Sequence, residues 1–373
     1  MYLMSTPLEL IGRSGEFQRI VEILAQDGDL LIAGVPGSGR RTLVRSAAKE
    51  VGATVLEIDC IRATDGSRFL QLLAEAISQN FDAMQIQNWV KTQQNEFFCF
   101  RNDENGGKLK LLRSSLALNS NSGGESNQKQ LWQAFELLLK LPQQLIESDD
   151  KRVVLILQSF PHIRSWDRSG LWEATLRREI KAQTHVSYVL IATIAEVSTH
   201  TDESDYPLEI LQLAPLDKDV IGVWAREILH TNGLTFDSRS RAMQLFLEAV
   251  QGHTGDAMAL ICRLQALCRT EGLITEIAVQ QVIQGLLQDL SITFESLLML
   301  LPPNQVHLLE SLACDPSDKP QSREYIQKHG LSRGGSLQGA LIGLQHKGLI
   351  YGAEQGYKLA LPLLALWLKQ RLE

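Results

Sequence analysis

Short apolar runs alternate with amphipathic stretches through the first 215 residues of the chain. The apolar runs are rich in Val, Ile and Leu, as strands covered on both faces of a parallel sheet are. Between them, apolar residues recur every three or four positions, which is typical of helices that bury one face. This alternation predicts an α/β domain with a parallel sheet and helices on both faces. We expect strands at Leu30–Ala33, Thr54–Ile58, Val153–Leu157, Val189–Thr193 and Ile210–Leu213, and helices at Glu16–Gln26, Arg41–Val51, Arg68–Asn80, Gln130–Leu145 and Leu171–Gln183.

The pattern becomes all-helical after residue 215. Residues 216–290 have apolar positions at helical spacing and predict a helical lid domain. After the doublet Pro302-Pro303, three short helical patterns precede a two-stranded hairpin, which is the arrangement of a winged helix. We therefore divide the chain into an α/β domain at 1–215, a lid at 216–290 and a winged-helix domain at 291–373. The helices expected in this last domain are Asn304–Ala313, Arg323–Lys328, Ser336–Lys347 and Pro362–Leu372.

One segment of the first domain breaks the alternation. Asn102–Asn127 is rich in Asn, Ser and Gly around the apolar patch Leu109–Leu118. This composition favours turns, so we expect a hairpin or a flexible insertion at about residues 102–127. A solvated loop without a functional role is the simplest interpretation of it.

A glycine-rich segment joins the first predicted strand to the next helix. The spacing of Gly34 and Gly39 matches the G-x4-G-K-[ST] pattern of a phosphate-binding loop. Glycines let the backbone turn its N–H groups inward, and the positive end of the following helix points to the same place, so the segment suits phosphate. A purely structural turn is the alternative. The candidate nucleotide-binding residues are Gly34, Pro36, Gly37, Ser38, Gly39, Arg40, Arg41 and Thr42.

Two arginines stand where the pattern has lysine and a hydroxyl. Arg40 keeps the positive charge of the lysine, but its guanidinium is wider and planar. Arg41 removes the hydroxyl that would bind Mg2+, and Thr42 comes one residue late. Two arginines can still hold a diphosphate. The loop therefore points to ATP or ADP as the ligand and argues against Mg2+.

The strand that should carry the acids of a nucleotide hydrolase lacks them. In such enzymes an aspartate at the end of an apolar strand holds the metal ion. Here the strand Val153–Leu157 ends in Gln158 and Ser159, which have no carboxylate. Asp59 and Glu57 on the preceding strand are the alternative acids, although an acid in the position of Asp59 more often caps a helix. We expect little or no ATPase activity.

These motifs, in this order, resemble those of the AAA+ and STAND family of P-loop ATPases, which includes archaeal-type ATPases and origin initiators. Ile11, Gly12 and Arg13 resemble the motif that borders the adenine pocket in that family. Gln158 and Ser159 resemble its second acidic motif with both acids replaced. The resemblance covers nearly the whole chain and implies the three domains described above.

The resemblance also implies three sensor positions. Thr193 ends the strand that resembles sensor 1. The segment Gln251–Met258 resembles the sensor 2 motif of the initiators, with Met258 in the position of their arginine. Arg263, about one helical turn further on, is the candidate to replace that arginine, and a surface arginine is its simpler interpretation.

Composition and charge exclude several classes of protein. The net charge of -7 gives no general attraction to nucleic acid. The five cysteines form no CxxC pair and are odd in number, which predicts buried thiols in a reducing compartment rather than disulfides or a metal site. No signal peptide and no membrane span are expected, since neither a basic start with an apolar run nor a long apolar stretch is present. We expect a cytoplasmic protein without a metal site.

The winged helix allows two interpretations. Its third helix could contact DNA through Arg333, Ser336, Gln338 and Lys347. Residues 291–373 contain eight Lys or Arg and seven Asp or Glu, and this near-neutral balance does not favour phosphate contacts. We therefore expect the domain to bind protein partners, with DNA as the alternative.

Together these features predict a catalytically degenerate ATP- or ADP-binding protein that acts as a regulatory or assembly module through protein–protein contacts, with an oligomer as one of its forms. Three alternatives remain at this point. The first is an active ATPase that recruits another carboxylate. The second is a structural scaffold that binds no nucleotide, and the third is a DNA-binding, initiator-like ATPase.

Overall fold

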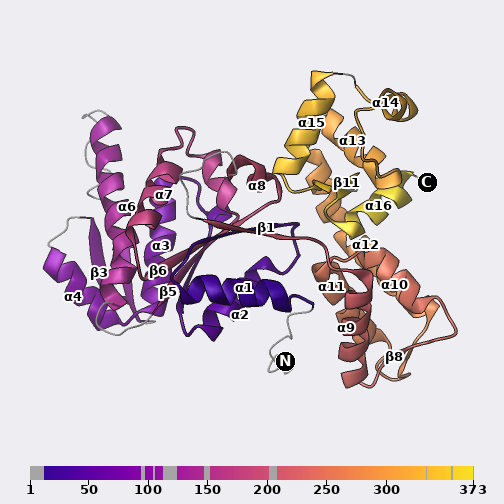
Figure 1. Ribbon diagram of the computed structural model, residues 1–373, viewed down its shortest axis with the longest axis horizontal. Coiled ribbons are helices and arrows are strands. Elements are labelled where there is room, and N and C mark those ends of the chain that lie inside the picture. Colours follow the sequence, from indigo (N-terminus) through magenta and orange to yellow (C-terminus); the bar gives the residue numbers. More distant parts are fainter. Residues whose placement is uncertain are drawn as a thin grey trace.

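The computed structural model describes residues 12–93, 97–103, 106–111, 124–146, 152–200, 208–332, 334–353 and 356–372. A sheet domain forms one half of the molecule, and the mainly helical second half of the chain forms the other (Figure 1). None of the described helices is both long and apolar enough to cross a membrane.

The sheet has five parallel strands in the order β2-β5-β6-β1-β7. This arrangement confirms the predicted parallel α/β fold, and all five predicted strands are present. β6 lies between β1 and β5, so the carboxyl ends of these three strands lie side by side at one edge, where open α/β sheets bind their ligands. The strands are β1 (Leu30–Gly34), β2 (Thr54–Asp59), β5 (Val153–Gln158), β6 (Val186–Ala192) and β7 (Glu209–Leu213).

Helices cover both faces of the sheet because successive strand residues point to opposite sides. Leu30 and Ile32 of β1 pack with α1 (Ser14–Ala25) and α2 (Arg40–Glu50). Leu31, between them, belongs to a separate core on the other face. The helices that contribute to this second core include α3 (Gly66–Asn80), α6 (Gly124–Ile146) and α7 (Leu171–Ala182).

The glycine-rich segment predicted as an insertion begins inside an antiparallel hairpin. β3 (Phe98–Asp103) pairs with β4 (Gly106–Leu111), and the buried Phe98 and Leu109 attach the hairpin to the core over α3. A helix not predicted from the sequence, α4 (Ala83–Gln93), precedes it. Residues 104–105 and 112–123 of the predicted insertion lie outside the described residues.

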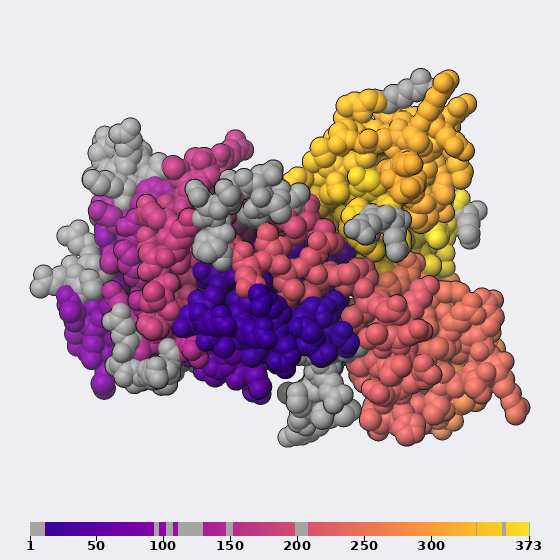
Figure 2. Space-filling model, viewed as in Figure 1, coloured from indigo at the N-terminus to yellow at the C-terminus, as the bar shows by residue number. Residues whose placement is uncertain are grey.

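The second half contains the lid and the winged helix. Their apolar residues, from Leu216 to Leu368, form one continuous core. In Figure 2 the winged helix, orange to yellow, rises beside the sheet domain and above the lid. The lid helices are α9 (Lys218–Thr231), α10 (Ala242–Val250) and α11 (Thr254–Leu267), with the short strands β8 (Thr235–Phe236) and β9 (Leu273–Ile274). The winged helix consists of α13 (Pro303–Cys314), α14 (Arg323–His329), α15 (Gly335–His346), β10 (Ile350–Ala353), β11 (Gly356–Leu359) and α16 (Pro362–Leu372).

The structure places no break at the domain boundary drawn from the sequence at residue 290. The helix α12 (Glu276–Met299) runs through this point without interruption. Leu287 before it and Phe294 after it are buried in the same core, and the ring of Phe294 lies 5.6 Å from that of Trp367 in α16. The lid and the winged helix therefore pack as one unit.

Candidate functional site

The segment after β1 has the geometry of an anion-binding bend. Gly37 and Gly39 have φ angles of 78° and 85°, a left-handed conformation that side chains disfavour. Gly39 is the N-cap of α2, so the free N–H groups of the first helical turn face the bend. This strand, bend and helix are arranged as the glycine spacing predicts.

A cavity of about 970 Å³ opens over this bend. The lid and the winged helix both contribute to its wall, opposite the bend and the carboxyl ends of the strands. The bend supplies Pro36, Gly37, Ser38, Gly39, Arg40, Arg41 and Thr42; the strand ends supply Gln158, Ser159, Ala192 and Thr193; the lid supplies Trp224, Thr254, Gly255 and Met258; and the winged helix supplies His346 and Lys347.

The cavity has a strongly positive wall in a protein of net charge -7. Its fully charged residues are Arg13, Arg40, Arg41 and Lys347, and no Asp or Glu lines it among the described residues. Three buried polar atoms on its wall have no hydrogen-bond partner in the described part of the chain: Ser38 Oγ, Thr193 Oγ1 and Arg13 Nε. Buried polar atoms are normally paired, so these three are suited to a polar ligand.

Arg40 crosses the edge of the sheet. Its Nη1 donates a hydrogen bond to the carbonyl oxygen of Ala192, at the end of β6. Burial of the guanidinium lowers the pKa of Arg40 to about 10, so it stays charged at neutral pH. A charged donor is thus fixed beside Thr193, which follows Ala192 in the chain.

Arg41 is held by an acid from β2. Its Nε and Nη2 donate to the two carboxylate oxygens of Glu57, at 2.5 and 3.0 Å. Arg45 lies one turn further along α2 and forms an ion pair with the same carboxylate at 3.1 Å. Gln158 donates to Glu57 through Nε2, so the ends of β2 and β5 are connected by side chains.

The wall does not fit a magnesium ion. Mg2+ in phosphate sites needs one or two carboxylates, and the positions that would supply ligands hold Arg41 and Gln158. The two acids suggested as replacements are engaged elsewhere: Glu57 binds Arg41, and Asp59 accepts a hydrogen bond from the backbone N–H of Ile61 as an N-cap. No cluster of three or more His, Cys, Asp or Glu side chains suited to a metal occurs among the described residues.

Ser159 has a left-handed backbone. Its φ of 51° is uncommon for a residue with a side chain. The residue follows β5 directly and is the N-cap of η2 (Phe160–Ser165), and both Gln158 and Ser159 line the cavity.

The lid contacts the bend directly. The ring of His253 reaches the carbonyl oxygen of Pro36 through Nε2. Thr254 Oγ1 and the N–H of Gly255 both donate to the carbonyl oxygen of Gly37, at 2.6 and 3.0 Å. Sequence reasoning assigned a role in this segment only to Met258, which lines the cavity; the docking of residues 253–255 was not anticipated.

The winged helix contacts the bend from the other side. A Cβ atom on Gly348 would lie 3.0 Å from Thr193 Cγ2 and 3.6 Å from Pro36 Cγ, so this turn packs tightly on the cavity wall. The two residues before it, His346 and Lys347, line the cavity. Lys347 was a candidate DNA contact in the sequence, and the fold brings it to the cavity instead.

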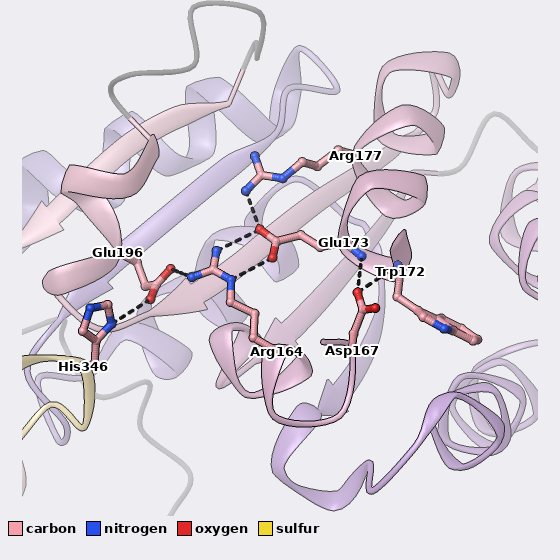
Figure 3. A network of polar contacts seen from close by, with 7 residues as sticks. All are labelled: Arg164, Asp167, Trp172, Glu173, Arg177, Glu196 and His346. Carbon is pink, nitrogen blue, oxygen red and sulfur yellow. Dashed lines mark hydrogen bonds and ion pairs between the residues drawn. The ribbon is translucent and has the colours of Figure 1, made fainter. Parts of the chain in front are cut away.

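A network of charged side chains reaches His346, two residues before Gly348 (Figure 3). Arg164 in η2 donates to both carboxylate oxygens of Glu173, at 2.8 and 2.9 Å, and to the buried Glu196 of α8 (Ala195–His200) at 2.7 Å. Burial alone would raise the pKa of Glu173, but hydrogen bonds from Arg164 and Arg177 outweigh it and lower this pKa to about 2. His346 of the winged helix lies 3.9 Å from Glu196, so the network reaches from α7 to the winged helix.

The other residues predicted for the adenine pocket and the sensors lie at different places in the fold. Arg13 is buried and donates to the carbonyl oxygen of Ala214 at 2.5 Å, so it connects the start of α1 to the segment that leads into the lid. Gly12 is not on the cavity wall but packs on the lid, where a Cβ atom would lie 2.2 Å from Val220. Ile11 lies outside the described residues. Arg263 does not line the cavity and forms an ion pair with Asp289 of α12.

Trp224 of the lid lines the cavity but was not predicted as a site residue from the sequence. It lies on α9 at a position that also belongs to the helical core pattern, and it is 7% exposed. Periodicity marks such a residue only as buried, because the pattern does not show whether the apolar face meets the core or a cavity.

Comparison with known proteins shows what this arrangement is similar to. A family model described as "Probable winged helix domain" matches residues 292–370. No curated protein matches the chain. A solved Walker-type ATPase of Pyrococcus abyssi is 16% identical over 96% of this chain and 96% of its own, with a TM-score of 0.63. A chain of the Drosophila ORC bound to DNA is 15% identical over 100% of this chain and 89% of its own, with a TM-score of 0.50. The chain therefore shares the fold of this Walker-type ATPase, and its residues 292–370 match a winged helix domain.

Proposed function

We propose that the chain is a regulatory module that binds ATP or ADP in the cavity between the sheet domain, the lid and the winged helix. The observation that carries this proposal is a cavity wall with four fully charged cations and no acid among its described residues. A diphosphate matches such a wall, because guanidinium and backbone N–H groups bind phosphate oxygens strongly. Trp224 and Met258 supply apolar surface for a base on the lid side.

Turnover is not part of the proposal. Hydrolysis needs a group that positions water and, in most such enzymes, a metal ion held by an acid. Gln158 and Ser159 offer no carboxylate at the end of β5, and Glu57 and Asp59 are not on the wall of the cavity. The chain would bind nucleotide without hydrolysing it, and the bound nucleotide would fix the arrangement of the sheet domain, the lid and the winged helix.

The regulatory role follows from the position of the ligand. Residues 253–255 of the lid bind the bend, and Gly348 of the winged helix packs against Pro36. A ligand that binds best when all three walls are in place stabilises that closed arrangement. A protein partner would then bind the closed arrangement on the second half, where Ile292 and Met299 of α12 and the following Leu300 are exposed.

The DNA-binding alternative is less well supported by these positions. Of the four residues that could contact DNA, Lys347 lies on the cavity wall. Arg333 lies outside the described residues and counts for neither alternative. A helix used in the major groove needs its basic contacts free. The scaffold alternative requires that no nucleotide binds, which the first experiment decides.

The first experiment is thermal denaturation with ATP or ADP at millimolar concentration, followed by calorimetric titration. Saturation to one hundred times Kd should stabilise the protein by about 2.7 kcal/mol. Changing Ser38 to alanine should weaken the affinity, because only the unpaired hydroxyl is removed. Phosphate release should stay at background. The absence of any shift with either nucleotide would favour the scaffold, and release well above background would favour an active ATPase.

A second experiment tests whether nucleotide binding closes the lid and the winged helix on the bend. Hydrogen exchange should slow on nucleotide addition in residues 253–255 and 346–348, because the closed arrangement protects their backbone N–H groups. Protection confined to the bend, with both docking segments unchanged, would mean that nucleotide does not organise the domains.

A further inference from the structure

We infer that the guanidinium of Arg41, fixed by Glu57 beside Gln158, takes the place of the magnesium ion, so that the cavity binds nucleotide phosphates without metal. This inference rests on the proposed function. It concerns the two positions from which a phosphate loop and its partner strand normally bind the ion, the hydroxyl position after the loop and the acid at the strand end. In this chain they hold Arg41 and Gln158.

Glu57 connects these two positions. It accepts hydrogen bonds from Arg41 of α2 and from Gln158 of β5, and both donors line the cavity. Glu57 itself is off the cavity wall, with a side chain that is 13% exposed. A partly buried carboxylate thus lies behind the wall and holds the Arg41 guanidinium at the cavity surface.

The orientation of Arg41 leaves part of it free for a ligand. Its bonds to Glu57 use Nε and Nη2, and Nη1 makes no hydrogen bond within the described part of the chain. The side chain is 53% exposed on the cavity side of α2. Guanidinium presents its N–H groups in a fixed plane, so one edge can bind a carboxylate while another binds a phosphate oxygen.

The local charge supports the same assignment. Arg41 and Arg45 both pair with Glu57, so two arginines already occupy the carboxylate nearest to the Gln158 position. A divalent cation would have to displace these arginines and would find an amide rather than an acid at Gln158. An acid at that position would face Glu57 across the strands, so the amide also removes a repulsion between two carboxylates. The three side chains are consistent as a set only without the metal.

The test is the affinity for ADP, measured by calorimetry in excess Mg2+ and in excess EDTA. The wild-type Kd should be the same within about twofold in the two conditions. Arg41→Ala should weaken binding by about tenfold or more in both, as loss of a charged hydrogen bond does. Lys49→Ala removes the same charge from an exposed position two turns along the same helix, and it should leave Kd within about twofold.

A paired replacement tests the assignment in the opposite direction. Arg41→Thr combined with Gln158→Asp supplies a hydroxyl and an acid, so binding should become tighter in Mg2+ than in EDTA by about tenfold or more. Thermal denaturation of each variant without ligand separates loss of fold from loss of affinity. Wild-type binding that requires Mg2+, or an Arg41→Ala variant that binds like Lys49→Ala, would overturn the inference and leave the proposed function standing. No binding in either condition would overturn both.

Discussion

The ring of His253 in the lid binds the backbone carbonyl of Pro36 in the phosphate loop. The other ring nitrogen accepts the N–H of Asp256 at 3.0 Å, and the Asp256 carboxylate accepts the N–H of Leu363, the second residue of α16, at 3.2 Å. A continuous path of hydrogen bonds therefore runs from the loop through the lid to the winged helix. The loop, the lid and the last helix of the chain cannot move independently while this path is intact.

The close approach of His253 makes Gly37 sensitive to substitution. A Cβ atom at Gly37 would lie 2.4 Å from the His253 ring, and the residue also has a left-handed φ. Any side chain at Gly37 is destabilising because of the left-handed φ, and we call this cost the backbone penalty. Gly37→Ala should lower the free energy of unfolding by about 1–3 kcal/mol beyond this backbone penalty, as overpacking does. Urea denaturation measures this difference.

Gly52 provides the matched control. It has a similar φ of 69°, and a Cβ atom there would meet nothing within 4 Å. Gly52→Ala should therefore show only the backbone penalty, about 1–2 kcal/mol. In a His253→Ala background the two glycine variants should become equal. If Gly37→Ala stays as costly there as in the wild type, contact with the lid is not the cause.

The pair His253 and Asp256 should make stability depend on pH. Burial alone would lower the pKa of His253. When the ring is protonated, however, Nδ1 can donate to Asp256 Oδ1, 3.1 Å away, instead of accepting the N–H, and this hydrogen bond and the charge of Asp256 raise the pKa above the ordinary 6.5. A raised folded-state pKa stabilises the protein fully below pH 6.5 and progressively less as the pH rises through the folded-state value. The difference in unfolding free energy between wild type and Asp256→Asn should therefore be larger at about pH 6 than at about pH 9.

Asparagine is the suitable replacement because its carbonyl oxygen can still accept the N–H of Leu363. The docking of α16 is then kept, and only the charge near His253 is lost. A difference between the two proteins that is constant over this pH range would show that the charge of Asp256 does not act on the ring.

Local patterns predict the sheet and the winged helix well. The helix Pro362–Leu372 is found with the expected bounds, because a proline start and a regular apolar face are local signals. The strand β6 begins at Val186, three residues before the expected Val189. The polar Ser187 interrupts the apolar run there, yet it is 2% exposed, and only the packing of the sheet shows this.

The site was predictable in part. The loop residues were visible because glycine spacing is a local requirement of the bend. The contact of Glu57 with Arg41 and Gln158 was not, since it depends on which strands are neighbours. The same holds for α12, where the helical repeat continues through residue 290 and only the shared core reveals that the lid and the winged helix are one unit.

Arg164 should be one of the most important charged residues for stability. It binds Glu173 and the 2%-exposed Glu196, so Arg164→Ala leaves two partly or fully buried carboxylates without their main partner (Figure 3). The expected loss is about 3–5 kcal/mol, as found when one member of a buried pair is removed. Chemical denaturation at neutral pH measures it.

Arg19→Ala is the control, because Arg19 also pairs with two glutamates, Glu22 and Glu209, but all three side chains are 47–58% exposed. Its removal should change stability much less than the removal of Arg164, because ion pairs in water contribute little. The loss of unfolding free energy in Arg164→Ala, beyond that in the control variant, should decrease as the pH falls from 4.5 towards 2. The folded-state pKa of Glu173 is lowered to about 2, so the stabilisation that its charge provides is lost in this range. Equal losses for the two variants would mean that the network in Figure 3 does not stabilise the fold.

Lys347 tests whether the winged helix takes part in nucleotide binding. It lies on the cavity wall, and its Nζ donates to Gln305 Oε1 at 3.1 Å, which directs the side chain from the winged helix. Lys347→Glu reverses the charge beside the proposed phosphates and should weaken ADP affinity by about threefold to tenfold at low salt. Lys319→Glu makes the same change on an exposed residue of the same domain that is off the cavity wall, and its Kd should equal that of the wild type. The difference in ADP affinity between Lys347→Glu and Lys319→Glu should become smaller at high salt, because salt screens charge interactions at an open site. Equal affinities at low salt would mean that the winged helix closes the cavity sterically without contributing charge.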